Sequence, residues 1–141
     1  MADLKINQVY YNLLDIEGFS RMMKSRTLHR GGKRMKIHNK LVRDKIPEII
    51  EAAGKSCVTH ILSEKEYIAA LETKLNEEVA EYLEDKSLGE MADVLEVLQA
   101  LCIARGYSLE KLESVRAKKA NERGGFKEKI FLEYVTEENQ E

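Results

Sequence analysis

Four acidic side chains stand in two closely spaced pairs in the middle of the chain, within the stretch NEEVAEYLEDKSLGEMADVLEV. Glu78 and Glu81 form the first pair, and Glu90 and Asp93 form the second. The members of a pair are three residues apart, so on a helix they share one face about one turn apart. Four carboxylates at close quarters repel one another by roughly 4 kcal/mol per pair at about 4 Å, for an effective dielectric constant near 20. The stretch therefore needs a positive partner, or some of these groups must be protonated.

A divalent metal ion meets this need, and the ligand atoms indicate which one. All-carboxylate sites offer hard oxygen donors, which favour Mg²⁺ or Mn²⁺. Zinc and ferritin-type di-iron sites use histidine, and the 3 histidines of the chain lie outside this stretch. The alternative is that these are ordinary solvated helix charges, as in most Glu-rich helices. That alternative weakens when two such pairs occupy facing apolar surfaces.

Two long helices must position these carboxylates. Ser63 followed by Glu66 forms a capping box, which predicts a helix from there to about Glu84. A second helix is predicted over Leu88 to about Arg105. The loop between the two helices is short enough to force an antiparallel pair. Both acidic pairs can therefore face each other across one interface.

The helical wheels separate the acidic residues by environment. Glu78 falls inside the apolar stripe of the first helix, Glu81 and Lys74 lie along its edge, and Glu77 is expected further round, towards solvent. The second helix is apolar nearly all round, which predicts burial on most of its sides. The two helices alone do not enclose enough surface, so we expect burial against another subunit, in at least a homodimer.

The remaining elements are short and lie on either side of this helix pair. In chain order they are a helix over Lys45–Ala53, capped by Asp44 and stopped by Gly54, an extended segment over 57–62, a helix from Ser108 through Lys119 or Ala120, and a strand within 126–135. The pattern predicts an all-α fold, a helical bundle completed by oligomerisation, with one or two short peripheral strands.

Composition excludes several classes of function. The 141 residues carry 23 Lys plus Arg and 25 Asp plus Glu, a net charge of -2, which argues against a general affinity for nucleic acid. No apolar run is long enough to span a membrane, and no apolar signal core is present at the N-terminus. The two cysteines, Cys57 and Cys102, have no metal-like or redox-like spacing. We expect a soluble protein in the reducing cytoplasm.

The acidic motifs resemble those of a known family. E-x-x-E at Glu78 and Glu81, followed by E-x-x-D at Glu90 and Asp93, resembles the signature of the all-α nucleoside triphosphate pyrophosphohydrolases, which include MazG-type house-cleaning enzymes, dimeric dUTPases and phosphoribosyl-ATP pyrophosphohydrolase. The segments NKLVRDKIPEII and KKANERGGF resemble a small MazG-like subgroup described as phosphoribosyl-ATP pyrophosphohydrolase-like. The resemblance runs from about Met35 to Val135.

This resemblance implies hydrolysis between the α and β phosphates of a nucleotide, which releases a monophosphate and pyrophosphate. It implies that Glu78, Glu81, Glu90 and Asp93 are the Mg²⁺ ligands and that Glu77 holds or activates the water. It also implies assembly as a homodimer or homotetramer. The carboxylates do not separate a general nucleotide-cleaning role from a role in histidine biosynthesis, since both use the same metal chemistry. The alternative from another class is a non-catalytic helical homo-oligomer that serves as an interaction module.

A phosphate chain also needs cations from the protein. Lys119 and Arg123 share a face if the third long helix continues that far, with Lys118 beside them. The alternative for this group is a basic helix end that interacts with its own dipole. Lys40, Arg43 and Lys45 offer a second basic set, in which Arg43 or Lys45 reaches the nucleotide or pairs instead with Glu48 or Glu51.

The first 34 residues differ in texture from the rest, and we expect them to be an appendage or a poorly ordered leader to a domain over 35–141. Met35 opens a segment typical of a domain start. Gly31 and Gly32 can be encoded by a purine-rich ribosome-binding sequence. We therefore consider translation from Met35 alongside a genuine flexible arm.

Overall fold

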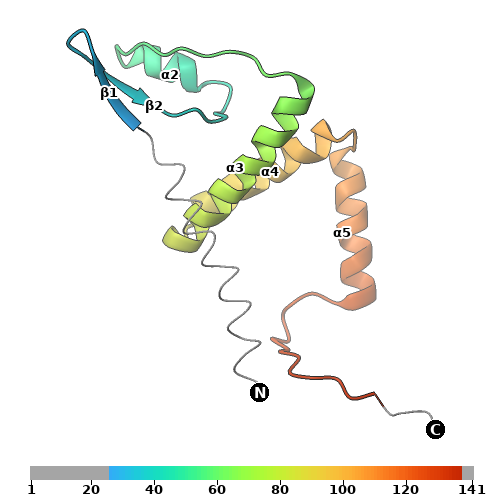
Figure 1. The fold of residues 1–141 in the computed structure, drawn as a ribbon. Helices are drawn as coiled ribbons and strands as arrows, with labels where there is room; N and C mark the ends of the chain where they lie inside the picture. The colour runs from blue at the N-terminus through green and yellow to red at the C-terminus, as the bar shows by residue number, and fades with distance from the viewer. Residues whose placement is uncertain (1–25, 138–141) are drawn as a thin grey trace. The chain divides into compact units, whose positions relative to one another are not determined.

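The computed structural model describes residues 26–137, which contain four helices and one two-stranded sheet (Figure 1). The elements are β1 (Arg26–Arg30), β2 (Lys33–Ile37), α2 (Ile46–Ala52), α3 (Glu64–Asp85), α4 (Leu88–Ala104) and α5 (Leu109–Arg123). The chain divides into two compact units between Gly106 and Tyr107. The mostly helical content agrees with the all-α prediction. Among residues 26–137, none of the helices combines the length and the apolar character that a bilayer crossing needs.

A β-hairpin that the sequence analysis did not anticipate begins the described chain. β1 and β2 pair antiparallel, with Leu28 opposite Met35, and Gly31 and Gly32 form the turn. Both glycines have positive φ, +58° and +76°, which is the requirement of a type I′ turn and is met most easily by glycine. The predicted domain boundary after residue 34 falls inside β2, and the start at Met35 stays a prediction. The other residues of the expected appendage, 1–25, lie outside the described residues.

The two segments that were predicted to be extended strands are irregular. Residues 57–62 and 126–135 belong to neither helix nor strand, so both predictions are wrong. Val58, Ile61 and Phe126 are almost fully exposed. A β-branched or aromatic segment forms a strand only when a neighbouring strand accepts its hydrogen bonds and covers one face. Neither segment has such a neighbour among the described elements.

The short helix α2 begins one residue later than expected and ends one residue earlier. Its N-cap is Lys45, which makes no side-chain capping hydrogen bond, so the prediction that Asp44 caps this helix is wrong. Pro47 in the first turn costs little, because no intrahelical donor is lost there. Gly54, with φ +75°, follows the helix as predicted, and its N–H donates to Glu51 O at 2.9 Å.

Three serines cap the three longer helices. Ser63 accepts from the Glu66 N–H, and the Glu66 carboxylate accepts from the Ser63 N–H, which confirms the capping box of α3. Ser87 caps α4 by accepting from the Glu90 N–H, and Ser108 caps α5 by accepting from the Lys111 N–H. α5 continues to Arg123, beyond the predicted end at Lys119 or Ala120.

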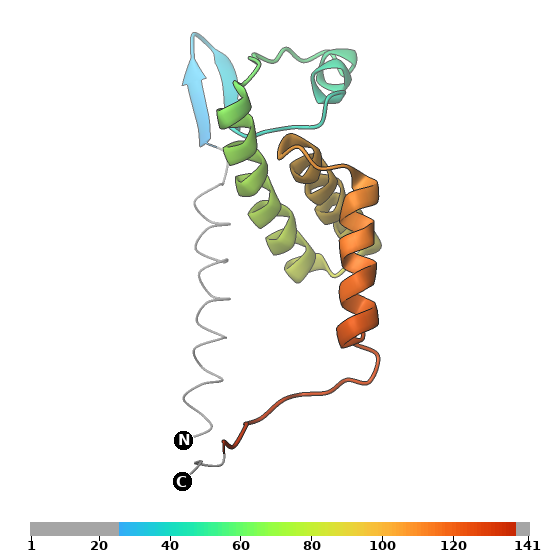
Figure 2. The same ribbon diagram turned by 90° about the vertical axis from the view of Figure 1, so that its right-hand side faces the viewer.

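The helices α3 and α4 pack against each other as an antiparallel pair, as predicted from their short connection (Figures 1 and 2). Only Lys86 and Ser87 separate them, and Lys86 adopts a left-handed conformation with φ +59° to make the turn. This geometry places the end of α3 beside the beginning of α4.

A single chain buries little apolar surface. Leu71 on α3 and Val97 on α4 are the buried hydrophobic residues among those described. α4 exposes a row formed by Leu88, Met91, Leu95 and Leu98, which recur at helical spacing. One chain therefore forms a helix pair with an open apolar face, and the bundle expected from oligomerisation stays a prediction.

Candidate metal centre

Three of the four predicted carboxylates converge where α3 and α4 meet. Glu78 and Glu81 come from the last two turns of α3, and Glu90 comes from the first turn of α4. One carboxylate oxygen of each lies within 4.8 Å of the others. Glu78 is buried, Glu90 is half-buried and Glu81 is exposed. The i, i+3 spacing on α3 and the two-residue connection produce this arrangement, because they set both helix ends at the same level.

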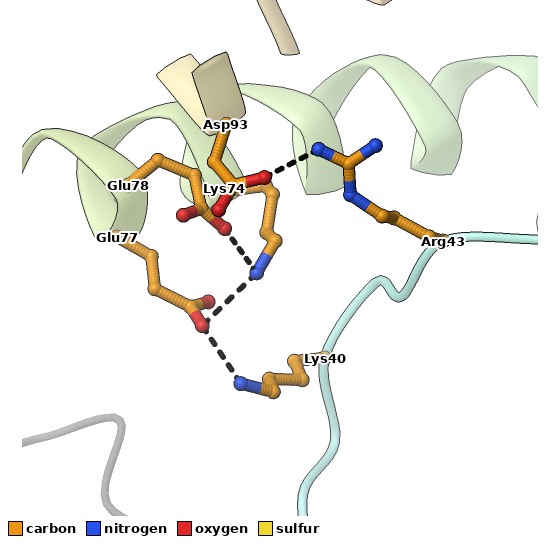
Figure 3. A network of polar contacts seen from close by, with 6 residues as sticks. All are labelled: Lys40, Arg43, Lys74, Glu77, Glu78 and Asp93. Carbon is orange, nitrogen blue, oxygen red and sulfur yellow. Dashed lines mark hydrogen bonds and ion pairs between the residues drawn. The ribbon is translucent and has the colours of Figure 1, made fainter. Parts of the chain in front are cut away.

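The fourth predicted ligand, Asp93, lies outside this group of three. Its Oδ1 accepts a hydrogen bond from Arg43 Nη2, which comes from the segment between β2 and α2 (Figure 3). This hydrogen bond raises the pKa of Arg43, with smaller contributions from the charges of Asp93, Glu96 and Glu78. The pairing of Arg43 with Glu48 or Glu51, considered above, is not what is found. Arg43 instead lies at the acidic face of α4.

Two lysines that were given no specific role at the site bind its carboxylates. Lys74 Nζ lies between Glu77 and Glu78, 3.1 Å from Glu77 Oε1 and 2.5 Å from Glu78 Oε1 (Figure 3). Lys40 Nζ donates to the same oxygen of Glu77 at 2.8 Å. The i, i+3 and i, i+4 spacing of Glu77 and Glu78 from Lys74 could have predicted these two ion pairs from the sequence. Lys40 carried no such signal, since its contact spans 37 residues.

The expectation that Glu77 turns towards solvent is wrong. Its side chain is only 10% exposed, because Lys40 reaches across from the segment after β2 and covers it. Burial alone would raise the pKa of Glu77, but hydrogen bonds from Lys40 and Lys74 outweigh burial and hold that pKa below its usual value. Glu77 is therefore ionised at neutral pH, with Oε1 engaged by two ammonium groups.

The other oxygen of Glu77 has no hydrogen-bond partner. Glu77 Oε2 and Glu90 Oε2 are both buried from solvent, and neither accepts a hydrogen bond from any described residue. A buried carboxylate oxygen without a partner is costly, because it has lost its water without compensation. These two oxygens are the feature that distinguishes the cluster from ordinary solvated helix charge.

Burial and neighbouring charges also disfavour the ionised forms of two carboxyl groups in the cluster. Burial, followed by the charges of Glu78 and Glu77, raises the pKa of Glu81. Burial, followed by the charges of Asp93 and Glu78, raises the pKa of Glu90. The positive charge of Lys74 lowers both pKa values, but burial and the neighbouring carboxylates outweigh it. The donor set fits a hard divalent ion, since every candidate ligand atom is a carboxylate oxygen.

The basic residues predicted near the C-terminus lie in the second unit. Lys118, Lys119 and Arg123 are exposed residues of α5, and Lys118 Nζ is 3.8 Å from Glu122 Oε1 on the same helix. Their role as phosphate ligands stays a prediction.

Comparison with known proteins leaves the family of this chain open. No protein-family model matches it, and no solved structure matches it. An uncharacterized protein of Mycolicibacterium smegmatis is 61% identical over 41 residues, which make up 29% of this chain and 42% of that protein. The match thus spans less than half of the relative's length, and the relative's description names no activity. These comparisons therefore assign no chemistry to the site.

Proposed function

We propose that this protein is a Mg²⁺-dependent nucleotide pyrophosphohydrolase, which cleaves the α–β phosphoanhydride of a nucleoside triphosphate or of phosphoribosyl-ATP. The observation that carries the proposal is the convergence of Glu78, Glu81 and Glu90 oxygens within 4.8 Å, together with two buried carboxylate oxygens, Glu77 Oε2 and Glu90 Oε2, that have no hydrogen-bond partner among residues 26–137. The resemblance of the acidic motifs to the all-α pyrophosphohydrolases supplies the reaction. Mn²⁺ is the other ion that this donor set suits.

The balance of charge at the site supports a divalent ion. Five carboxylates belong to it, namely Glu77, Glu78, Glu81, Glu90 and Asp93, and three cations contact them, namely Lys40, Arg43 and Lys74. Two negative charges remain without compensation when all five groups are ionised. One Mg²⁺ neutralises both. Glu78, Glu81 and Glu90 would hold the ion, and Asp93 would join them once Arg43 moves aside.

The proposed chemistry divides between the ion and the side chains. When bound, Mg²⁺ supplies charge neutralisation and orientation of the phosphates for in-line displacement. Glu77 is the side chain that would orient the attacking water, because its Oε2 is buried, ionised and without a protein partner. That oxygen can accept a hydrogen bond from the water and take its proton as the bond from the water oxygen to the α phosphorus forms, the α–β phosphoanhydride bond breaks and pyrophosphate leaves. Lys74, which belongs to the same helix, holds the carboxylate in place through the other oxygen.

The experiment that tests this function measures pyrophosphate release from a panel of nucleoside triphosphates and phosphoribosyl-ATP, with and without Mg²⁺. Glu78→Gln and Asp93→Asn remove one carboxylate each and are expected to lower kcat by about 10²-fold or more, the usual scale for an electrostatic group in a reaction centre. Glu84→Gln is the matched control, because Glu84 is an exposed acidic residue of the same helix. The proposal would be refuted if both site variants were as active as the control, or if no substrate released pyrophosphate.

The same panel addresses the biological role. Preference for phosphoribosyl-ATP would support a role in histidine biosynthesis, and a broad preference for triphosphates would support nucleotide cleaning. Either role belongs in the cytoplasm, where these substrates occur and where two cysteines without disulfide-like spacing stay reduced.

A second candidate function is a non-catalytic helical homo-oligomer that acts as an interaction module. The observation that favours it is the exposed row Leu88, Met91, Leu95 and Leu98, together with a core of only two buried apolar residues among those described. A chain of this size needs more buried apolar surface to fold stably. We therefore propose a homodimer or homotetramer under either function. A monomer at micromolar concentration in light scattering would contradict the assembly, and the substrate panel separates the two functions.

A further inference from the structure

The cations at the acidic site differ in how firmly they are held. Lys74 belongs to α3 itself, is 17% exposed at its side chain and bridges Glu77 and Glu78 from the same helix. Lys40 and Arg43 come from outside the helix pair, and their side chains are 32% and 56% exposed. Lys74 is therefore an internal counter-charge, whereas the other two approach from the solvent side (Figure 3).

Lys40 and Arg43 are carried by one irregular segment. Residues 38–43 form neither helix nor strand, so the two side chains can change partners without breaking regular structure. Each binds a different helix, since Lys40 donates to Glu77 on α3 and Arg43 donates to Asp93 on α4. The segment thus places two positive charges, three residues apart in the chain, at the face where the carboxylates converge.

These two contacts compete with a metal ion. A carboxylate whose oxygen is bound by an ammonium or guanidinium group has less charge to offer a divalent ion. When an ion neutralises the carboxylates, the attraction that holds Lys40 and Arg43 falls. Both cations are then available to an anion that arrives on the solvent side.

We propose that Lys40 and Arg43 are the polyphosphate-binding side chains of this site, and that a divalent ion releases them from Glu77 and Asp93. The inference rests on the proposed function, because it takes the carboxylate cluster to be a metal site. A polyphosphate suits these two groups in particular. The guanidinium of Arg43 can bind two phosphate oxygens at once, and Lys40 adds a compact charge beside it. The two side chains thus act as counter-ions of the metal-free site and as phosphate ligands of the loaded one.

The test measures binding, so it does not depend on activity. Calorimetry gives the affinity of the full chain for Mn²⁺ alone, and then the affinity of the Mn²⁺-loaded protein for inorganic pyrophosphate, a probe that requires no knowledge of the base. The variants are Lys40→Met and Arg43→Met. Lys55→Met is the matched control, because Lys55 is an exposed cation just after α2 that makes no ion pair with any residue in the described range. Urea unfolding of each variant checks that it remains folded.

The expected result is a pair of opposite changes. Lys40→Met and Arg43→Met each raise Mn²⁺ affinity by roughly two- to fivefold, because a competing cation of the strength of an exposed ion pair is gone. Each lowers pyrophosphate affinity by roughly tenfold or more, because charge-assisted hydrogen bonds to phosphate are lost. A purely structural role would lower both affinities together. Lys40→Arg, which keeps the charge, should restore most of the pyrophosphate binding.

Three results would overturn the inference, and they identify which part failed. If the unaltered chain binds no Mn²⁺, the proposed metal site fails and the inference falls with it. If it binds Mn²⁺ and both methionine variants match Lys55→Met in both affinities, the metal site stands and the role of Lys40 and Arg43 is wrong. If Mn²⁺ affinity rises in the variants while pyrophosphate affinity stays unchanged, the two residues are counter-ions only.

Discussion

Replacing Lys74 with methionine should destabilise the metal-free protein and make its stability depend strongly on Mg²⁺. Lys74 is the one cation that contacts both Glu77 and Glu78 within the described chain, at 3.1 Å and 2.5 Å. Methionine keeps much of the apolar stem but removes the charge. The variant leaves two adjacent carboxylates, of which Glu77 keeps its ion pair with Lys40 and Glu78 loses its ion pair with Lys74.

The magnitude follows from these distances. For an effective dielectric constant of about 20, separations of 2.5 Å and 3.1 Å correspond to attractions of about 7 and about 5 kcal/mol. Most of this attraction offsets the cost of removing the three charges from water, and breaking a buried pair costs about 3–5 kcal/mol in practice. Side-chain exposures of 17%, 10% and 6% allow partial screening. We expect a loss of about 2–3 kcal/mol in the free energy of unfolding.

Urea unfolding followed by circular dichroism, at one fixed protein concentration, measures this loss. Lys65→Met is the control, because Lys65 is an exposed lysine of the same helix and its loss should change stability by no more than about 0.5 kcal/mol. Adding Mg²⁺ at about ten times the Kd of the Lys74 variant should restore about 1.4 kcal/mol to that variant. The same concentration should stabilise the unaltered protein less, because Lys74 competes there with the ion for Glu77 and Glu78. If the Lys74 and Lys65 variants lose the same stability, or Mg²⁺ stabilises neither, the electrostatic account of the site is refuted.

Four further measurements test other parts of the structure. Burial and neighbouring carboxylates raise the pKa values of Glu81 and Glu90 above 4.5 in the folded protein. Ionised Glu81 and Glu90 therefore destabilise the fold at pH values above these raised pKa values, and this destabilisation disappears as the pH falls through the raised pKa values. The double variant Glu81→Gln and Glu90→Gln should therefore unfold at higher urea than the unaltered protein at neutral pH without metal, and a gap that widens on acidification would contradict this. Ser63→Ala removes the capping hydrogen bond of α3 and should cost about 1 kcal/mol in urea unfolding, whereas Ser63→Thr should cost less. Lys86→Gly relieves a left-handed lysine and should add about 0.5–1 kcal/mol, which thermal unfolding would detect as a higher Tm. Leu95→Glu places a charge in the exposed row of α4 and should lower the molecular mass measured by light scattering, and an unchanged mass would show that this row lies outside the interface.

The parts of the fold that local side chains determine were predictable. Ser63 and Glu66 bind each other's backbone within one turn, so the start of α3 follows from four residues of sequence. The convergence of Glu78, Glu81 and Glu90 follows from helical spacing and a short connection. In each case the relevant residues lie close in the chain, so pairwise spacing is enough to place them.

The parts that depend on distant segments were not predictable. No residue near Glu77 in the chain indicates that Lys40 covers it, so the helical wheel predicted a solvent-exposed carboxylate. Residues 57–62 have the composition of a strand, but a strand also needs a neighbour, and the sequence does not name one. The Gly31–Gly32 turn did carry a local signal, since two glycines between segments of equal length favour a type I′ hairpin. That signal was missed because the flanking residues are basic and lack the alternating apolar pattern of most strands.

The order in which this site assembles during folding follows from how far apart its members lie along the chain. Glu78, Glu81 and Glu90 are joined by one helix end and a two-residue turn, which form quickly because little chain must be ordered. Lys40 and Arg43 make contacts across 37 and 50 residues, and closing such loops carries a larger entropic cost. The carboxylates therefore meet before these counter-ions arrive, and their repulsion opposes the formation of the helical hairpin at that stage. We expect divalent ions to accelerate folding of the chain, acting as a template at a step that Lys40 and Arg43 cannot yet assist.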